Sequence, residues 1–294
     1  MKTLLVTGAS GFLGFNICRA ARSSWKVFGA YFSRRAAIDG VNVVPVDATR
    51  FSELKKLFRE VRPDAVIHAA AVARPNLCQQ NPSWSHAVNV EASINIAGLC
   101  SDLTIPCAFI SSDLVFDGLN APYKEEDPVS PVSLYGEQKV QAETAVLDRH
   151  PGAAVCRTSL MFGDDSSPST SFIQPMISAM KENRPQTLFI DEFRTPMSAD
   201  TAVQGILLAL AGARGRIHLG GPERISRYEF GLLLRDILGF RDARLNPGRQ
   251  QDVAMPAPRP PDVSLDCSRA IELGFRPSPI RTELERLFGP VPPI

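Results

Sequence analysis

The stretch Val6-Thr7-Gly8-Ala9-Ser10-Gly11-Phe12-Leu13-Gly14 decides the fold of this chain. It follows an apolar run that predicts a buried strand, and it leads into helical spacing over residues 12–21. A first glycine can turn sharply out of the strand, a second admits a ligand close to the backbone, and a third lets the helix pack on the sheet. The N–H groups that open such a helix attract anions. The stretch therefore predicts a loop that holds the pyrophosphate of a dinucleotide.

Composition narrows the class of protein. The 294 residues carry a net charge of +1, so nucleic acid and anionic membranes are not expected partners. We find neither a long apolar run nor a signal peptide after Met1, which leads us to expect a cytoplasmic protein. The six cysteines form no Cys-x-x-Cys pair, and we expect them to be buried thiols. The four histidines are scattered, and we expect no metal site.

The end of the second predicted strand, residues 26–32, bears on the choice of cofactor. Nucleotide-binding folds that prefer NAD place a carboxylate here for the ribose 2′-hydroxyl. This chain has Ser33-Arg34-Arg35 instead, and guanidinium groups grip phosphate with paired hydrogen bonds. We therefore expect NADP(H) to be preferred over NAD(H). The alternative is a solvated basic loop.

Two further strand ends carry residues suited to the cofactor. Asp47 follows the strand predicted over residues 41–46 and could accept from the adenine amino group or cap the next helix. The strand over residues 64–68 runs into Ala69-Ala70-Ala71, where small side chains let the cofactor lie flat against the backbone. Asn89 falls within a helix predicted over residues 83–101 and is placed to orient a neighbouring strand end.

The alternation of strands and helices predicts an α/β fold, a Rossmann-type doubly wound parallel sheet with a smaller C-terminal α/β substrate lobe. We assign residues 1–160 to the nucleotide-binding domain, with a return of about 187–212 to it, and residues 161–294 to the substrate lobe. A proline-rich stretch over residues 247–261 cannot form a regular helix or a central strand, so we expect a surface loop that borders a site.

Tyr135 and Lys139 stand four residues apart in a predicted helix, so both project from one face. A nearby ammonium stabilises tyrosinate, so we expect the lysine to lower the tyrosine pKa and fit it for proton transfer. Ser112 ends another predicted strand and can hydrogen-bond a reacting carbonyl. The tyrosine and lysine alone are a weak signal, which the serine and the distant glycine loop strengthen.

At this point the chain resembles the extended short-chain dehydrogenase/reductase family, within it the branch of dTDP-4-dehydrorhamnose reductase. The resemblance covers nearly the whole chain and is carried by these segments: residues 7–14, 68–71, 110–118, 122–127, 157–163 and 259–266, with Asn89, Tyr135 and Lys139. It implies reduction of a 4-keto sugar nucleotide by NAD(P)H, with Tyr135 giving the proton, Ser112 polarising the carbonyl, and Lys139 tuning the tyrosine and holding the ribose. Homodimerisation through the helices of Asn89 and Tyr135 is also compatible with it.

We predict the following catalytic and binding residues. The catalytic residues are Ser112, Tyr135 and Lys139. The cofactor-binding residues are Gly8, Ser10, Gly11, Phe12, Leu13, Gly14, Ser33, Arg34, Arg35, Asp47, Ala48, Ala69, Ala70, Ala71, Asn89, Ser111, Tyr135, Lys139, Thr158 and Leu160. Arg74, Asp113 and Val115 are predicted at the sugar, and Arg259 at the substrate diphosphate, where an ordinary structural salt bridge is its alternative role.

Two departures from the reductase pattern keep other functions open. Leu160 replaces a tryptophan that packs near the sugar in the rhamnose enzymes, and Arg74-Pro75-Asn76-Leu77 replaces their acidic stretch. That segment and residues 265–268 look more like the regulatory β subunit of methionine adenosyltransferase, a non-catalytic relative. A sugar-nucleotide epimerase or dehydratase with tightly held NAD is a third candidate. Arg34-Arg35 argues against it, as does Asp113 where a glutamate would follow the serine.

Overall fold

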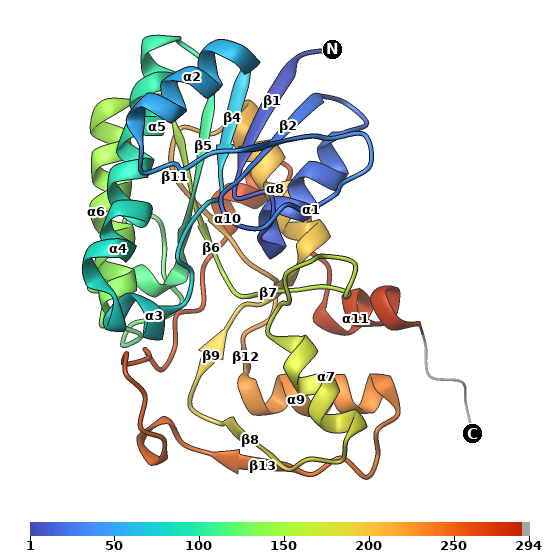
Figure 1. Ribbon diagram of the computed structural model, residues 1–294. Helices are drawn as coiled ribbons and strands as arrows, with labels where there is room; N and C mark the ends of the chain where they lie inside the picture. Colours follow the sequence, from blue (N-terminus) through green and yellow to red (C-terminus); the bar gives the residue numbers. More distant parts are fainter. Residues whose placement is uncertain (290–294) are drawn as a thin grey trace.

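A seven-stranded parallel sheet forms the centre of the chain in the computed structural model, which describes residues 1–289 (Figure 1). Its strands in spatial order are β11 (Gly215–Leu219), β6 (Ala154–Thr158), β5 (Cys107–Ser112), β4 (Ala65–His68), β1 (Thr3–Thr7), β2 (Lys26–Tyr31) and β3 (Asn42–Pro45). The chain starts in the middle of the sheet, winds to one edge through β2 and β3, and then winds to the other edge. This is the doubly wound Rossmann topology, and the predicted fold class is confirmed.

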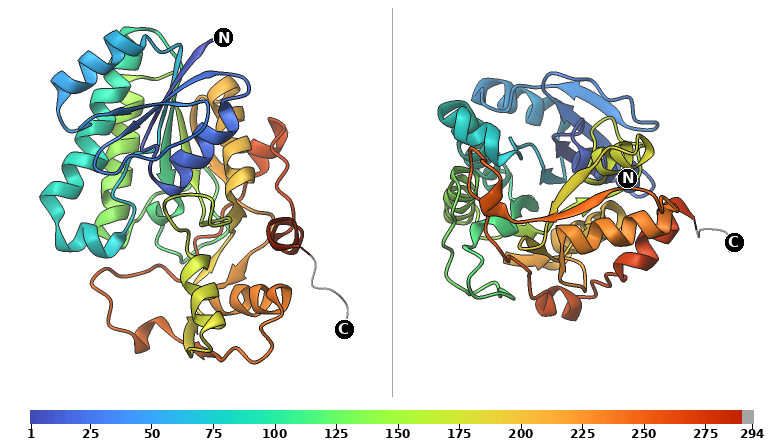
Figure 2. Two further views of the ribbon diagram at one scale, coloured as in Figure 1. Left: turned by 45° about the vertical axis from the view of Figure 1, so that its right-hand side comes forward. Right: turned by 90° about the horizontal axis from the view of Figure 1, so that it is seen from below.

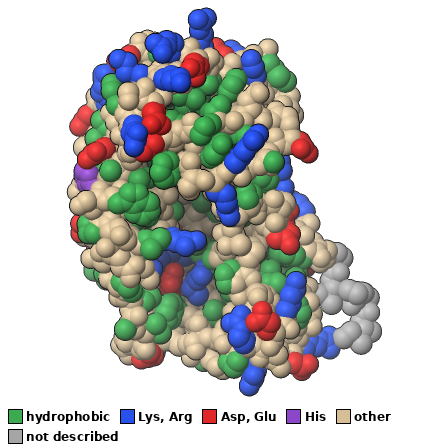
Figure 3. Space-filling model, in the orientation of Figure 1, with side chains coloured by type: hydrophobic (Ala, Val, Ile, Leu, Met, Phe, Trp, Pro, Cys, Tyr) green, Lys and Arg blue, Asp and Glu red, His purple; other side chains and the backbone are tan. Residues whose placement is uncertain are grey.

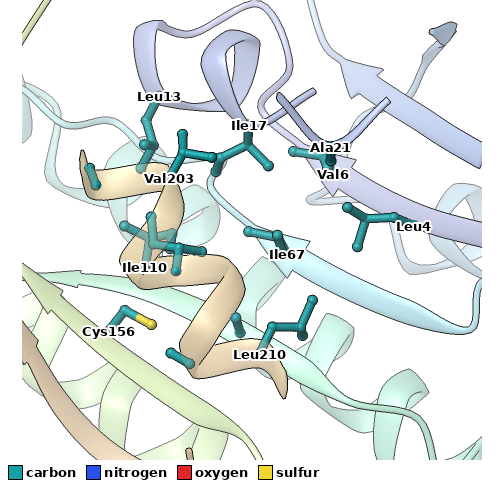
Figure 4. Packing of buried hydrophobic residues seen from close by; sticks show 14 of the residues in the cluster. Leu4, Val6, Leu13, Ile17, Ala21, Ile67, Ile110, Cys156, Val203 and Leu210 are labelled. Atoms are coloured by element: carbon teal, nitrogen blue, oxygen red, sulfur yellow. The ribbon is translucent and has the colours of Figure 1, made fainter. Parts of the chain in front are cut away.

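Two layers of helices cover the faces of this sheet. One layer consists of α1 (Phe12–Ala21), α8 (Ala199–Gly212) and the short α10 (Ser268–Glu272), and the other of α2 (Phe51–Val61), α5 (Ala92–Asp102) and α6 (Leu134–Arg149). Figure 4 shows the first layer at close range, with Leu13 and Ile17 of α1 and Val203 of α8 packed over the sheet residue Ile67. Both faces of the sheet are therefore buried, which explains the continuous apolar character of its strands.

The helix predicted over residues 83–101 is confirmed, and it contains a π-helical turn that the prediction did not include. It consists of α4 (Pro82–His86), a π-helical turn η1 (Ala87–Glu91) and α5. The sequence reasoning also missed the short α3 (Pro75–Gln80) just before it. A π-helical turn carries an extra residue and re-aims the side chains around it, and such turns are frequent at functional sites. Here the turn contains Asn89.

The lobe that we predict to bind substrate lies below the carboxyl ends of the strands (Figures 1 and 2). Its elements are β7 (Met161–Phe162), α7 (Ile173–Lys181), β8 (Gln186–Phe189), β9 (Phe193–Arg194), β10 (Met197–Ser198), β12 (Ile225–Ser226), α9 (Arg227–Leu238), β13 (Leu245–Gly248), the 3₁₀ turn η3 (Gln250–Asp252) and α11 (Ile280–Phe288). Helices α7, α9 and α11 share an apolar core built around Phe162 and Phe230. Figure 2 (left) shows α7 and α9 side by side beneath the sheet.

The segment that returns from the lobe to the sheet is α8 followed by β11. Strand β8 pairs with β13 in a separate two-stranded ribbon, which accommodates Pro247 because no further strand pairs with β13. The C-terminal helix joins the two units: Glu283 of α11 accepts from the backbone N–H of Ser198 at 2.8 Å and from Thr201 Oγ1 at 2.6 Å, both at the start of α8. Among residues 1–289, no helix has the length and apolar character needed to cross a bilayer.

Candidate active site

The glycine loop has the backbone geometry that each of its glycines was expected to provide. Gly8 adopts φ +74°, and a Cβ there would lie 2.7 Å from the Ala70 Cα, so strand β1 can turn beside β4 only with glycine. A Cβ at Gly14 would lie 2.1 Å from the Gly8 carbonyl oxygen, which shows how closely α1 packs on the turn. Gly11 caps α1 without a side-chain hydrogen bond. The first N–H groups of α1 are therefore left to a ligand.

A cavity of about 580 Å³ opens beside this loop. Of the predicted cofactor residues, those that line it are Gly8, Ser10, Gly11, Ser33, Arg34, Asp47, Ala48, Ala69, Ala70 and Ala71. They come from the carboxyl ends of β1, β2, β3 and β4, four strands that meet at one edge of the sheet. The volume and the glycine turn that closes one wall fit a dinucleotide.

Arg34 lines the cavity and also forms hydrogen bonds with a loop of the lobe. Its Nη2 donates to Ser169 Oγ at 2.7 Å and to the Pro168 carbonyl, and Ser169 Oγ donates to the Ser10 carbonyl at 2.8 Å. The loop that follows β7 is thereby fastened across the glycine turn. Arg35 is exposed and does not line the cavity, so only Ser33 and Arg34 of the predicted trio face the cofactor region.

The strand-end residues Asp47 and Asn89 are held by local hydrogen bonds. Asp47 Oδ1 accepts from the backbone N–H and the hydroxyl of Thr49 at 3.0 and 2.6 Å. Asn89 is fully buried, and its Oδ1 accepts from the Val72 N–H at 2.8 Å while its Nδ2 donates to Gln138 Oε1 at 2.9 Å. Asn89 thus positions the segment after β4, the backbone role expected of it, rather than lining the cavity itself.

The remaining predicted cofactor residues do not line this cavity. Ser111 Oγ donates to Glu143 Oε1 at 2.6 Å, and Thr158 Oγ1 donates to the Ser111 carbonyl at 3.1 Å, so both hydroxyls belong to a buried polar network. Leu13 packs in the core, while Phe12 lies against Gly163 and Leu160 accepts a backbone hydrogen bond from Met197.

Ser112, Tyr135 and Lys139 converge at the end of β5. Ser112 Oγ caps the 3₁₀ turn η2 (Asp113–Val115) by accepting from the Leu114 N–H at 3.2 Å. Helix α6 packs onto this turn because its third residue is Gly136, where a Cβ would lie 2.2 Å from the Leu114 carbonyl oxygen. That close approach brings Tyr135 to Ser112. Lys139, one turn further, donates from Nζ to the Ile110 carbonyl at 2.8 Å.

Burial shifts the pKa values of Tyr135 and Lys139. It raises the pKa of Tyr135 above its usual value, the charges of Asp113 and Cys78 raise it further, and contact with the Ser112 hydroxyl acts in the opposite direction. The expected lowering of the tyrosine pKa by Lys139 is therefore wrong: its Nζ lies 5.8 Å from the tyrosine ring centre, and burial is the largest influence on that pKa. Tyr135 is thus a protonated donor at neutral pH. Burial lowers the pKa of Lys139 to about 8, against the charge of Glu143.

Tyr135 also borders the dinucleotide cavity. It packs with Val72 and Cys78 in a small apolar cluster, and Leu77 and Val88 pack against that cluster. Val72, Leu77 and Val88 all line the cavity. The proton donor and the cofactor site are therefore separated by a single layer of side chains.

The residues predicted to line the sugar have different surroundings in the structure. Asp113 is buried beside Ser112, whose hydroxyl donates to its Oδ1 at 3.0 Å, and its Oδ2 lies 3.6 Å from Arg194 Nε. Val115 is fully buried in a cluster with Phe116 and presents no surface to a ligand, because the 3₁₀ turn directs its apolar side chain inward. Its prediction as a sugar-lining side chain is wrong.

Arg74 and Arg259 have different surroundings in the structure. Arg74 lines the dinucleotide cavity rather than a separate sugar pocket. Arg259 is half-buried, and it donates to Asn76 Oδ1 at 3.0 Å and to the Ala257 carbonyl at 3.1 Å. Neither partner is charged, and among residues 1–289 no carboxylate forms the salt bridge considered for this guanidinium.

Sequence reasoning missed several cavity residues. Ser169 reaches the glycine loop from 159 residues away, and no local pattern marks such a contact. Trp84 and Val88 line the cavity from α4 and the π-helical turn, which a regular helix would have aimed differently. The exposure of Trp84, which leaves its ring available to a ligand, is a property of the structure that the sequence alone does not reveal.

The whole chain is similar to proteins of one family. Residues 1–291 match the model of the RmlD substrate binding domain. The methionine adenosyltransferase 2 subunit beta of Mus musculus is 31% identical over 300 residues, covering 98% of this chain and 88% of the relative. A probable low-salt glycan biosynthesis reductase, Agl14, of Haloferax volcanii is 32% identical over 288 residues and 96% of both chains.

Solved structures agree with the fold. A dTDP-4-dehydrorhamnose reductase from Clostridium acetobutylicum superposes with a TM-score of 0.84 at 25% identity, covering 97% of this chain and 98% of that one. A dTDP-4-dehydrorhamnose reductase from Bacillus anthracis, solved in complex with NADP, superposes with a TM-score of 0.83 at 22% identity. The match covers 98% of this chain and 99% of that one. With its glycine turn, its buried serine, tyrosine and lysine, and a family model that matches almost its full length, this chain belongs to the RmlD substrate binding domain family.

Proposed function

We propose that this chain is an NADP(H)-dependent oxidoreductase that reduces a keto group on a sugar nucleotide, as a dTDP-4-dehydrorhamnose reductase does. The observation that carries the proposal is the protonated Tyr135 beside Ser112, one layer of side chains from a cavity that suits a dinucleotide. A nicotinamide cofactor bound there supplies a hydride to the carbonyl carbon. The family and the reductases among its relatives support the same reaction class.

Each catalytic side chain has one task in this reaction. Ser112 donates a hydrogen bond to the carbonyl oxygen and Tyr135 transfers its phenolic proton to that oxygen, so that the carbonyl becomes an alcohol. Lys139, positively charged below its pKa of about 8, stabilises the tyrosinate that is left behind. Arg34, at the end of β2, meets the 2′-phosphate and favours NADP(H) over NAD(H). Asn89 fixes the backbone at Val72 against which the cofactor lies.

One observation favours a second function, a cofactor-binding regulatory subunit. The methionine adenosyltransferase 2 subunit beta of Mus musculus is 31% identical to this chain across nearly its whole length. The intact Ser112, Tyr135 and Lys139 do not separate the two functions, because a regulatory subunit can retain them. Turnover and partner binding do separate them.

The test is consumption of NADPH, followed by its absorbance, with a panel of 4-keto nucleoside diphosphate sugars. The wild type should oxidise NADPH with at least one of them. Tyr135→Phe removes only the hydroxyl, so NADPH binding and folding should survive while the rate falls by about 10²–10⁴-fold. Full activity of that variant would assign the proton to another group.

The regulatory function makes the opposite prediction. If the wild type binds NADPH, oxidises none of the panel, and co-purifies with a methionine adenosyltransferase catalytic subunit, the reductase proposal is wrong. Titration of the purified catalytic subunit with wild type and with Tyr135→Phe provides the comparison, because a scaffold would not depend on the phenolic hydroxyl.

A further inference from the structure

Arg74 is a cation in the wall of the cavity that no anion of the protein neutralises. Its side chain is exposed and lines the cavity, and among residues 1–289 it forms neither an ion pair nor a side-chain hydrogen bond. It precedes α3 without capping that helix. The donors of its guanidinium are therefore available to a ligand.

The cavity as a whole carries more positive than negative charge. Among the described residues that line it, the charged side chains are those of Arg34, Arg74 and Asp47. Asp47 is already engaged, because its carboxylate accepts from the Thr49 hydroxyl at 2.6 Å and pairs with Arg50 at 3.4 Å. The cavity therefore favours ligands with several negative charges.

Arg74 belongs to the end of the cavity that adjoins the catalytic trio. In the first turn of α3 the Cys78 N–H donates to the Arg74 carbonyl at 3.1 Å, and Cys78 packs in one cluster with Tyr135. Helix α3 also packs against α6, which carries that tyrosine. Arg34 instead follows β2, which β1 separates from β4. The two guanidiniums therefore belong to different ends of the cavity.

The anions of a dinucleotide already have donors elsewhere. Its pyrophosphate fits the glycine loop and the first N–H groups of α1, and its 2′-phosphate fits Arg34. The nicotinamide end, beside Tyr135, carries no phosphate. The anion that Arg74 can bind there is therefore one that the keto substrate brings.

The chemistry of a 4-keto sugar nucleotide indicates which anion this is. The diphosphate is attached to C1, across the sugar ring from the carbonyl at C4. The substituent at C6 is bonded to C5, the ring carbon next to the carbonyl. A carboxylate at C6 is therefore the negative group that lies beside the reacting carbon, and guanidinium binds a carboxylate with two parallel hydrogen bonds.

Trp84 adds an apolar face to the same wall. Its ring is 51% exposed and lines the cavity four residues before Val88, which packs against the cluster of Tyr135. An exposed indole offers a flat surface to the C–H face of a sugar ring. Figure 3 shows a hollow at mid-height, beside the position of α3 in Figure 1, with basic side chains at its edge.

We propose that Arg74 binds a carboxylate on the sugar ring of the substrate, so that the site selects an acidic keto sugar nucleotide over a neutral one. The inference rests on the proposed function for the nucleotide sugar and adds the chemical class of its sugar. Trp84 supports the ring while the guanidinium reads its charge.

The test is calorimetric titration of the NADP⁺-loaded protein with UDP-glucuronate and UDP-glucose, which differ only in whether C6 is a carboxylate or an alcohol. The wild type should bind UDP-glucuronate about tenfold or more tightly than UDP-glucose. Arg74→Met should abolish this preference by weakening UDP-glucuronate binding alone, and Arg74→Lys, which keeps the charge, should retain part of it. The control is Arg59→Met, an exposed position on α2 outside the cavity, which should change neither affinity.

Three results would overturn the inference. Equal loss of both nucleotide sugars in Arg74→Met would assign the guanidinium to the diphosphate, and loss of NADPH affinity would assign it to the cofactor. A wild type that binds neither nucleotide sugar, or binds both alike, would leave no preference to explain. The melting temperature of Arg74→Met should equal that of the wild type, because the exposed side chain bonds to no other residue among 1–289.

Oxidation of NADPH is measured separately with the keto sugar nucleotides. A protein that prefers UDP-glucuronate through Arg74 but oxidises NADPH with none of them would refute the reductase proposal and retain the carboxylate site. The two proposals therefore fail by different measurements.

Discussion

At the scale of one residue, the burial of Lys139 should make the rate of the reaction depend on pH. Burial among Phe109, Tyr135 and Ile110 disfavours its ammonium form and lowers its pKa to about 8. The side chain is therefore charged below that pH and neutral above it. Since only the charged form supports the tyrosinate, kcat/KM should decline above pH ~8 with a single ionisation.

A pH profile of kcat/KM checks this expectation, with stability and cofactor affinity monitored across the same range. In Tyr135→Phe the residual rate should lose that ionisation, because there is no tyrosinate to support. A wild-type profile that stays flat to pH ~10 would show that Lys139 remains charged or plays no part in proton transfer.

The residues of the catalytic trio could be identified from their spacing and order alone, but their ionisation could not. The sequence places Lys139 one turn from Tyr135, and from that spacing we expected a lowered tyrosine pKa. The structure adds how deeply both are buried and that the ammonium is directed at the Ile110 carbonyl. Depth of burial depends on Gly136 and the turn that it contacts, which spacing within one helix does not reveal.

At the scale of elements, the loop after β7 depends on Arg34 at the end of β2. The guanidinium holds Ser169, which in turn is bound to Ser10 in the glycine turn. Arg34→Ala should weaken NADPH binding far more than NADH binding, by about 1–3 kcal/mol for a lost charge-assisted phosphate contact. Calorimetry with both cofactors measures the difference.

The matched control is Ser169→Ala, which releases the loop but keeps the guanidinium. It should change the affinities for NADPH and NADH by the same factor. If Arg34→Ala also weakens the two cofactors equally, its role is to fasten the loop and not to recognise the 2′-phosphate.

Most strands and helices of the nucleotide-binding half could be predicted from the local sequence pattern. A feature that could not be predicted lies in the helix that contains Asn89. Apolar runs predicted the strands β1, β2, β3, β4 and β5 of the sheet to within a few residues. The π-helical turn between α4 and α5 could not be predicted in this way, since the helical spacing continues through Asn89. Within this turn Asn89 bonds to Val72 and Gln138, 17 and 49 residues away, and local sequence does not reveal such partners.

At the scale of the whole molecule, Glu283 joins the last helix to the nucleotide-binding half. Its carboxylate satisfies the Ser198 N–H and the Thr201 hydroxyl at the start of α8, where negative charge also suits the helix dipole. Glu283→Gln should lower the free energy of unfolding by about 1–3 kcal/mol, because charge-assisted bonds to buried groups are lost. Urea unfolding measures this loss.

Glu285→Gln serves as the comparison on the same helix, because Glu285 forms a partly exposed pair with Arg281 at 3.6 Å. It should change stability by well under 1 kcal/mol. Equal effects of the two substitutions would mean that the contact between α11 and α8 is not what stabilises the assembly of the two halves.

The contacts between the two halves could not be predicted from the sequence. Arg259 meets Asn76 across 183 residues, and Ser169 meets Ser10 across 159. Neither pair has a periodicity or a motif, because each depends on how the lobe is set against the sheet. Arg259 was singled out because it lies in the proline-rich loop and because its segment resembles a family motif, not because any pattern pointed to Asn76.

The position of β11 has a consequence for how the protein is made. The sheet is assembled outward from β1, and β6 pairs on its second side only when residues 215–219 have been synthesised. The lobe segment from 159 to 214 precedes them, which takes roughly 3–11 s at about 5–20 residues per second. Throughout that interval the unpaired backbone of β6 can bind a neighbouring nascent chain. Ribosomes that follow one another closely on a messenger therefore expose these chains to mispairing midway through translation rather than at its end.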